Sequence, residues 1–242
     1  KRDTKVLFRP TSGGRWKIGW MPPPELRNIR KIERGNMIAP NSRLGCGGVD
    51  SYDLDATVDN RGSKGACHLY NKFSMEHPSN IFVAEYISRP PMAKIFYEDI
   101  LMASYFYGYP LLIENNKYGI VRYFEERGYD GYVLDRPAHL RSTSSSVNVK
   151  TKGIPSNSQD VIQSHAQAIE DYIHQYVGSS EDGSIGVMPF NRTLEDWVGF
   201  KINDRTKYDL SISSGLALLA AQKVDKEKPK STFNEKEFFR SY

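Results

Sequence analysis

Hydrophobic and polar residues change their spacing along the chain, and these changes predict strands that alternate with helices. Short apolar runs bounded by turns predict strands at residues 44–50, 66–73, 81–86, 111–114 and 132–134. Apolar residues at helical spacing predict helices at residues 92–106, 118–127, 159–177, 194–200 and 208–224. Such an order favours an α/β fold, and the short links between the first strands predict that these strands are antiparallel.

The N-terminal part of the chain has a pattern of its own. Loose alternation over residues 5–20 around Ser12-Gly13-Gly14 predicts a β-hairpin, and apolar residues from Leu26 to Ile32 predict a short helix before Gly35. Residues 138–158 are rich in Ser, Thr, Lys and Asn and predict a long loop. We therefore expect an extension over residues 1–42, a main domain over 43–224 and a charged tail over 225–242.

Composition narrows the class of protein. The 242 residues, 39% hydrophobic and 26% charged, predict a folded soluble protein, and no apolar run has membrane-spanning length. Two cysteines are too few for a disulfide framework or a four-cysteine zinc site, so we expect reduced thiols in the core. The five histidines lack zinc spacing. A net charge of +4 is too small for nucleic-acid binding by overall charge, so any such binding depends on local patches.

Three carboxylates fall at the ends of predicted elements. Asp50 ends one strand, Glu114 ends another, and Asp209 stands at the start of the last apolar helix. In an open α/β sheet, strand ends and helix starts gather at one edge, where residues distant in sequence meet. Buried carboxylates that lie together favour a bound cation, and oxygen-only ligands select Mg²⁺ or Mn²⁺. This pattern predicts a site with two such ions, which activate water against a phosphodiester.

Each of these carboxylates also has a simpler interpretation. Asp50 opens an aspartate-rich segment and is suited to capping a turn. Glu114 is suited to the positive end of a helix, and Asp209 to an N-cap. Glu85 and Asp135 also end predicted strands, so position alone does not decide between these interpretations.

Five pieces of the sequence, in order from about Gly47 to Gln222, resemble the C-terminal nuclease domain of the large terminase subunit of tailed bacteriophages. The pieces are Gly48-Val49-Asp50-Ser51-Tyr52 followed by Gly62-Ser63-Lys64-Gly65-Ala66, then Val83-Ala84-Glu85-Tyr86 with Arg89-Pro90, then Leu112-Ile113-Glu114-Asn115-Asn116-Lys117-Tyr118-Gly119, then Thr151-Lys152-Gly153-Ile154-Pro155-Ser156-Asn157, and last Asn203-Asp204-Arg205-Thr206-Lys207-Tyr208-Asp209-Leu210. The third piece is similar to the segment that carries the family's metal-binding glutamate.

The resemblance implies a fold and a chemistry. It implies an RNase H-like mixed β-sheet of about five core strands flanked by α-helices, and an endonuclease that cuts double-stranded concatemeric DNA with little sequence specificity. Asp50 would bridge two ions, Glu114 and Asp209 would each complete one, and hydrolysis would leave a 5′-phosphate and a 3′-hydroxyl. The family has adjacent acids before its last helix, whereas here Tyr208 precedes Asp209, so Asp204 is the reserve ligand.

The resemblance also implies partners. Double-stranded DNA would be the substrate, and basic residues in nearby loops are candidates to bind its phosphates: Lys64, Arg136, Arg141, Lys150, Lys152, Arg205 and Lys207. A packaging motor would add a portal protein, a small terminase subunit and an ATPase domain of the same polypeptide, in the cytoplasm of an infected host cell. The chain has no Walker A loop and starts without Met or a signal peptide, so we expect it to be a piece of a longer polypeptide.

Two other classes of protein fit the same pattern. A Holliday-junction resolvase or a transposase-like enzyme would share the RNase H-like sheet but prefer a different DNA substrate. A non-catalytic module that grips DNA or docks on a portal would use the same acids structurally and bind no Mn²⁺.

Overall fold

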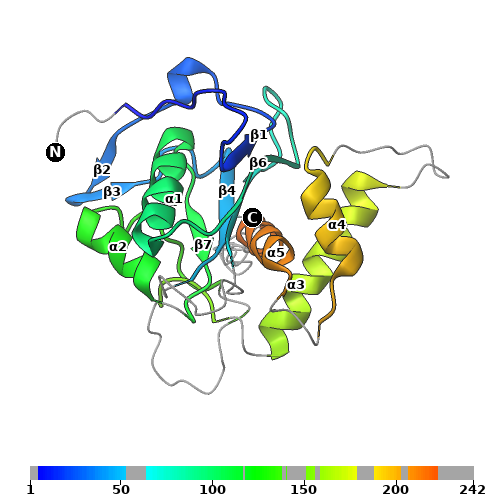
Figure 1. The fold of residues 1–242 in the computed structure, drawn as a ribbon. Coiled ribbons are helices and arrows are strands. Elements are labelled where there is room, and N and C mark those ends of the chain that lie inside the picture. Colours follow the sequence, from blue (N-terminus) through cyan, green and yellow to red (C-terminus); the bar gives the residue numbers. More distant parts are fainter. Residues whose placement is uncertain are drawn as a thin grey trace, which may run out of the picture.

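Five strands form one mixed sheet between two layers of helices in the computed structural model (Figure 1). The structure describes residues 5–52, 64–116, 118–137, 140, 151–155, 159–178, 188–202 and 207–222. The sheet has the order β1-β6-β5-β4-β7, where the strands are β1 (Trp16–Ile18), β4 (Gly45–Asp50), β5 (Gly65–Asn71), β6 (Ile81–Ser88) and β7 (Leu111–Ile113). All neighbours are antiparallel except β4 and β7, which run parallel.

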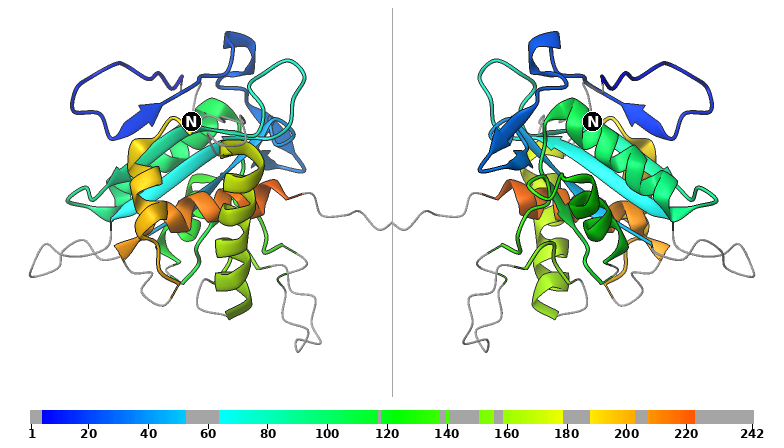
Figure 2. Two further views of the ribbon diagram at one scale, coloured as in Figure 1. Left: turned by 90° about the vertical axis from the view of Figure 1, so that its right-hand side faces the viewer. Right: turned by 90° about the vertical axis from the view of Figure 1, so that its left-hand side faces the viewer.

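Helices cover both faces of this sheet. On one face lie α1 (Ala93–Tyr107) and α2 (Gly119–Arg127). On the other face lie α3 (Gln159–Tyr172), which continues as the π-helical turn Ile173–Val177, α4 (Asn191–Gly199) and α5 (Asp209–Ala221). The left view of Figure 2 looks onto α3 and α4, with α5 between them and the sheet. No described helix is both long and apolar enough to cross a membrane.

Alternating side chains of the strands build two separate cores. On β7, Leu111 and Ile113 join the cluster with α1 and α2, whereas Leu112 joins the cluster with α3, α4 and α5. Val49 and Cys46 of β4 divide between the two clusters in the same way. Side chains of a strand point to opposite faces in turn, so a strand covered on both sides is apolar at most positions. Such burial explains the short uninterrupted apolar runs in the sequence.

The last helix packs unusually close to the central strand. A Cβ atom placed on Gly48 would lie 2.2 Å from both the amide nitrogen of Ala217 and the carbonyl oxygen of Ser213. Gly48 therefore allows the backbone of α5 to rest directly on β4. Residues 209–219 of this helix are all buried, which suits a sequence made mostly of small and apolar residues.

The main domain confirms most of the predicted architecture. The expected mixed α/β sheet with antiparallel first strands and flanking helices is present, and the predicted helices appear as α1 to α5 with small shifts of their ends. The fifth strand is wrong, however: residues 132–134 form only isolated bridges, such as that between Leu111 and Val133. The backbone there turns, because Tyr132 and Val133 donate to the carbonyls of Tyr129 and Asp130. The fifth strand of the sheet is β1.

The predicted N-terminal hairpin and helix are also wrong. Within residues 5–20 only β1 is a strand, and it pairs with β6 rather than with residues before the turn. The predicted helix is replaced by a 3-10 turn (Pro24–Leu26) and a hairpin of β2 (Lys31–Glu33) and β3 (Asn36–Ile38). Arg34 and Gly35 both have positive φ, of 50° and 85°, which is the geometry that a two-residue hairpin turn requires.

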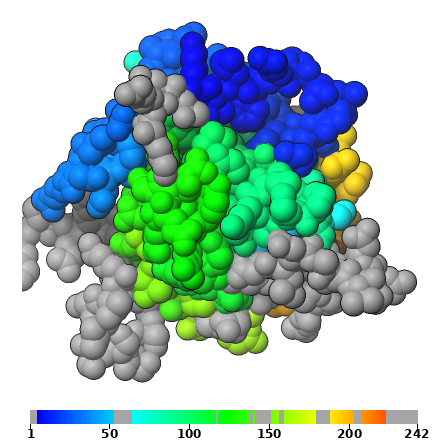
Figure 3. Space-filling model, turned by 60° about the vertical axis from the view of Figure 1, so that its left-hand side comes forward, coloured from blue at the N-terminus to red at the C-terminus, as the bar shows by residue number. Residues whose placement is uncertain are grey.

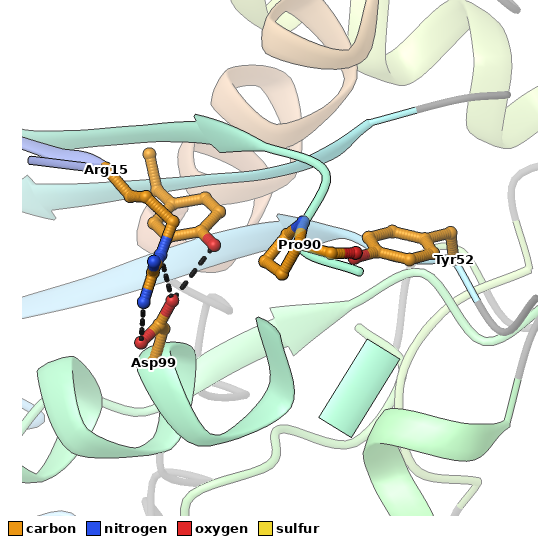
Figure 4. Close-up of polar contacts among 5 residues, drawn as sticks. Arg15, Tyr52, Pro90 and Asp99 are labelled. Atoms are coloured by element: carbon orange, nitrogen blue, oxygen red, sulfur yellow. Dashed lines mark hydrogen bonds and ion pairs between the residues drawn. The ribbon is translucent and has the colours of Figure 1, made fainter. Parts of the chain in front are cut away.

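Polar contacts fasten the N-terminal extension to the main domain. Arg15 donates to both carboxylate oxygens of Asp99 on α1, at 2.6 and 3.0 Å (Figure 4). Tyr86 of β6 donates to the same carboxylate at 3.0 Å. Figure 4 also shows Tyr52, directly beyond β4, whose hydroxyl donates to the carbonyl of Pro90 at 3.1 Å. In Figure 3 the N-terminal segment, in blue, borders the helices α1 and α2, in green. Through β1 the extension forms part of the sheet.

The structure describes both cysteines but not the predicted C-terminal tail. Cys46 and Cys67 are buried and free, as predicted. The tail at 225–242 lies outside the described residues, and so does most of the predicted loop at 138–158. The described part of that loop runs beside the sheet, where Ile154 forms a parallel bridge with Glu114.

Candidate active site

Asp50 lies at the end of β4, on the face of the sheet that α5 covers. Gly48, two residues earlier, touches the backbone of α5, and side chains two apart on a strand share a face. Only 6% of the Asp50 surface is exposed. The central strand therefore presents a buried carboxylate toward the start of the last helix.

Glu114 follows β7 directly and lies beside Asp50. The parallel register pairs Gly48 with Leu112 and Val49 with Ile113, and the Glu114 amide donates to the Val49 carbonyl at 2.9 Å. Neighbouring strands lie ~4.8 Å apart, so Glu114 and Asp50 occupy adjacent positions at one sheet edge. Glu114 is 8% exposed, and its carboxylate accepts a hydrogen bond of 3.2 Å from the Asn116 side chain.

Asp209 is the first residue of α5 and makes direct contact with Asp50. The two carboxyl groups are hydrogen-bonded to each other, and the amide of Lys64 donates to Asp209 Oδ2 at 3.1 Å. The N-cap of α5 is Tyr208, and no side chain caps the helix there. The side chain of Asp209 thus serves the contact with Asp50 and the start of β5 rather than an N-cap.

The carboxyl group of Asp209 is held in a setting that disfavours its charge. Burial and, to a smaller extent, the negative charge of Asp196 raise its pKa, which lies at about 6. The Lys64 amide, the charge of Lys64 and the contact with Asp50 act in the opposite direction. Two buried carboxyl groups in contact share a proton or attract a cation, because two like charges at this distance are unstable without one.

We expect Asp209→Asn to stabilise the metal-free protein at neutral pH. The folded state binds a proton on Asp209 up to about pH 6, whereas an unfolded Asp releases it near its ordinary pKa. Stability from this group is therefore fully present at low pH and is lost as pH rises through the folded pKa of about 6. The variant should gain on the order of 1–3 kcal/mol at neutral pH and almost nothing in acid.

Thermal unfolding in EDTA at several pH values measures this gain. Glu195→Gln, which removes an exposed carboxylate from α4, serves as the control and should leave the pH dependence unchanged. An Asp209→Asn protein with a melting temperature below that of the wild type at neutral pH would contradict the expected gain in stability.

Carboxylates from three elements, β4, β7 and α5, stand at this edge of the sheet. As they are placed, the His, Cys, Asp and Glu side chains of the described residues form no group of three that could hold a metal ion. The contact between Asp50 and Asp209 brings together two of the three residues that were predicted as ligands. Glu114 stands at the neighbouring strand end with its carboxylate on Asn116, and its side chain has three rotatable bonds.

The basic residues predicted to bind DNA separate into different groups. Lys64 and Lys207 are exposed and lie close to Asp209. The amide of Lys64 contacts the Asp209 carboxylate, and Lys207 stands two positions before Asp209 in the sequence. The ammonium of Lys152 instead has partners within the protein. It donates to the carbonyls of Asp130 and Val133 at 3.1 and 2.8 Å and pairs with the Asp135 carboxylate at 3.7 Å. Arg136, half-buried, donates its amide to Thr151. Outside the described residues lie Arg141, Lys150, Arg205 and the reserve ligand Asp204.

The two other carboxylates that were expected at strand ends do not end strands, because Glu85 lies inside β6 and Asp135 follows residues that form only isolated bridges. Glu85 of β6 is 1% exposed and accepts a hydrogen bond of 2.7 Å from Thr193 of α4. Asp135 pairs with Lys152. Both contacts account for these acids without a ligand.

Two residues near the site were not singled out from the sequence. Asp196 of α4 accepts hydrogen bonds from the amide and the hydroxyl of Ser211, at 2.6 and 2.7 Å, and burial raises its pKa. Arg89 lies over the ring of Tyr52, with its guanidinium carbon 4.5 Å from the ring centre. The sequence signal for Asp196 was weak, because it lies inside an amphipathic helix with no feature that links it to Asp209.

Comparisons with known proteins give a likeness in structure. No protein-family model matches the chain, and no curated protein matches it. Among solved structures, the chain is similar to the Thermus Phage P74-26 Large Terminase Nuclease Domain, with 12% sequence identity and a TM-score of 0.49. The match covers 82% of this chain and 92% of that one. A likeness of this size leaves the chemistry to be argued from the side chains of the site.

Proposed function

We propose that this chain is a metal-dependent endonuclease that cuts double-stranded DNA, with Asp50, Glu114 and Asp209 as the ligands of two Mg²⁺ or Mn²⁺ ions. The observation that carries the proposal is the contact between Asp50 and Asp209, which lie 159 positions apart in the chain (209 − 50) and are both buried. Glu114 occupies the adjacent strand end. Three acids from three elements thus gather at one edge of an RNase H-like sheet.

The chemistry of these side chains suits a hard cation. Their donors are all carboxylate oxygens, which favour Mg²⁺ or Mn²⁺ over softer metals. Bringing carboxylates together in a buried site costs several kcal/mol unless a counter-charge is present. A bound cation supplies that charge. We propose that Glu114 turns from Asn116 toward the two aspartates when the ions bind.

The proposed division of labour follows from the positions of the ligands. Asp50, which contacts Asp209 and stands at the strand end beside Glu114, would serve both ions, and Glu114 and Asp209 would each serve one. When bound, the ions supply positive charge to the phosphate and lower the pKa of a water molecule for attack. The protein contributes the fixed positions of its carboxylates and the exclusion of competing water by the sheet and α5.

Exposed or partly exposed cations are candidates to contact the DNA backbone. Lys64 and Lys207 flank Asp209, and Arg89 is held on the ring of Tyr52. Contacts with phosphate groups carry no information about base sequence, so we propose little sequence specificity. Lys152 takes no part in this surface, since its ammonium is bound within the protein.

A place in a viral DNA-packaging motor is the finer part of the proposal. It is supported by the ordered motif resemblance to the nuclease domain of the large terminase subunit. In that setting the partners would be an ATPase domain of the same polypeptide, a portal protein and a small terminase subunit, in the cytoplasm of an infected host cell.

Plasmid cleavage tests the proposed reaction. The chain should convert supercoiled plasmid to nicked and linear forms with Mn²⁺, and EDTA should stop the reaction. Linear duplex and a four-way junction should be cut at comparable rates. A strong preference for the junction would indicate a resolvase instead.

Calorimetry separates an enzyme from a structural module. The wild-type chain should bind Mn²⁺ in a titration, whereas an acid cluster with only a structural role should bind none at millimolar concentration. Absence of both binding and cleavage would overturn the proposed function.

A further inference from the structure

A chain of buried polar side chains joins the sheet to both α4 and α5. His68 of β5 lies with Nε2 2.8 Å from the Thr193 hydroxyl and with Nδ1 2.9 Å from the Ser213 hydroxyl. Thr193 in turn donates to Glu85 of β6 at 2.7 Å. None of these four side chains is more than 1% exposed. The ammonium of Lys17, on β1, lies 3.5 Å from the other oxygen of Glu85 and ends the chain at the sheet edge.

A β-bulge places Glu85 in this chain. Leu69 pairs with Ala84 and Tyr70 with Phe82, so Val83 is the extra residue of β6. Without the bulge, Phe82 and Glu85 would point to opposite faces of the sheet. With it, both face α4 and α5, and Glu85 lies directly across from His68.

The hydrogen bonds among these buried side chains are consistent with one assignment of donors and acceptors. Thr193 gives its hydroxyl proton to Glu85, so its oxygen accepts from Nε2–H of His68. Burial lowers the pKa of His68 to about 3, which leaves the ring neutral with a single N–H. Nδ1 is then an acceptor, and the hydroxyl of Ser213 donates to it.

The Ser213 hydroxyl has further acceptors within its own helix. The same oxygen lies 3.0 and 3.2 Å from the carbonyls of Asp209 and Leu210, one turn earlier, so His68 competes with these carbonyls for its one proton. When a neutral His68 accepts this hydrogen bond, it connects the N-terminal part of α5 to β5. Asp209 begins that part of α5.

Two neighbouring serines of α5 connect the same part of this helix to α4. Ser211 donates to Asp196, and Ser214 accepts a hydrogen bond of 2.9 Å from the indole of Trp197. The three serines thus divide their contacts between the sheet and α4. Only Ser213 links α5 to a side chain of a central strand within this set.

We propose that His68, acting through Ser213, is a positioning residue that sets the place of Asp209 relative to Asp50 for metal binding. This inference rests on the proposed function. If His68 has this role, loss of its hydrogen bonds changes metal binding as well as stability, whereas loss of an ordinary buried hydrogen bond changes stability alone.

Ser213→Ala and Ser214→Ala form a matched pair for the test. Each removes one buried hydroxyl from the same helix, and both should lower the melting temperature. Only Ser213→Ala should raise the Mn²⁺ concentration for half-maximal plasmid cleavage, by about tenfold, as loss of a group that orients a metal ligand does. The assay is run well below the melting temperatures of both variants.

A second pair keeps the test decisive if Ser213→Ala does not fold. Thr193→Val removes the acceptor of His68 at nearly constant volume and should raise the Mn²⁺ concentration that cleavage requires. Thr193→Ser keeps the hydroxyl and should cleave at the Mn²⁺ concentration of the wild type. Equal Mn²⁺ requirements for wild type and for Ser213→Ala, or for Thr193→Val and Thr193→Ser, would overturn the role of His68. A wild type that neither cuts DNA nor binds Mn²⁺ would instead overturn the proposed function.

Discussion

Asp50→Asn is expected to reduce Mn²⁺-dependent DNA cleavage by about 10³-fold or more. Asn keeps the size of the side chain and one oxygen atom but loses the charge that would serve two cations. The fold should survive, because the variant also removes one of two buried carboxyl groups in contact. A melting temperature in EDTA equal to or above that of the wild type is therefore expected.

Rates of plasmid nicking at saturating Mn²⁺ measure this loss, with thermal unfolding on the same samples. Asp135→Asn is the matched control, since Asp135 also follows an apolar run but its carboxylate pairs with Lys152 rather than with a second carboxylate. It should cut at nearly the wild-type rate. Cleavage by pure Asp50→Asn protein at the wild-type rate would refute the assignment of Asp50.

Gly48→Ala is expected to destabilise the protein by about 3 kcal/mol or more and to abolish cleavage with it. The added Cβ would lie 2.2 Å from backbone atoms of Ala217 and Ser213. Backbone atoms cannot rotate away as a side chain can, so α5 must shift as a whole. Such a shift moves Asp209, the first residue of that helix, away from Asp50.

Chemical denaturation of Gly48→Ala and of Gly13→Ala makes the comparison. A Cβ on Gly13 would meet nothing within 4 Å, so this second variant should match the wild type in stability and activity. A stable, active Gly48→Ala protein would show that α5 does not need its close approach to β4.

The main sheet could be predicted because its strands are short and covered on both faces. Leu111, Leu112 and Ile113 are all apolar, since alternate residues enter opposite cores. The positions of Asp50 and Glu114 followed from the same rule, because each stands where such a run stops. The start of α5 was visible in the sequence from its apolar composition.

Other features depend on contacts that local patterns do not contain. β1 forms by pairing with the distant strand β6, and the β2–β3 turn requires positive φ at Arg34, a residue type that rarely adopts it. The internal role of Lys152 depends on carbonyls in the turns before it. The histidines lack zinc spacing, so nothing in the sequence indicated a polar role for His68, whose two partners come from α4 and α5.

Anomalous diffraction from crystals soaked in Mn²⁺ tests the central claim most directly. We predict two strong peaks that lie between the carboxylates of Asp50 and Asp209 and a Glu114 side chain turned toward them. Peaks elsewhere on the protein, with these three side chains unmoved and unligated, would contradict the proposal.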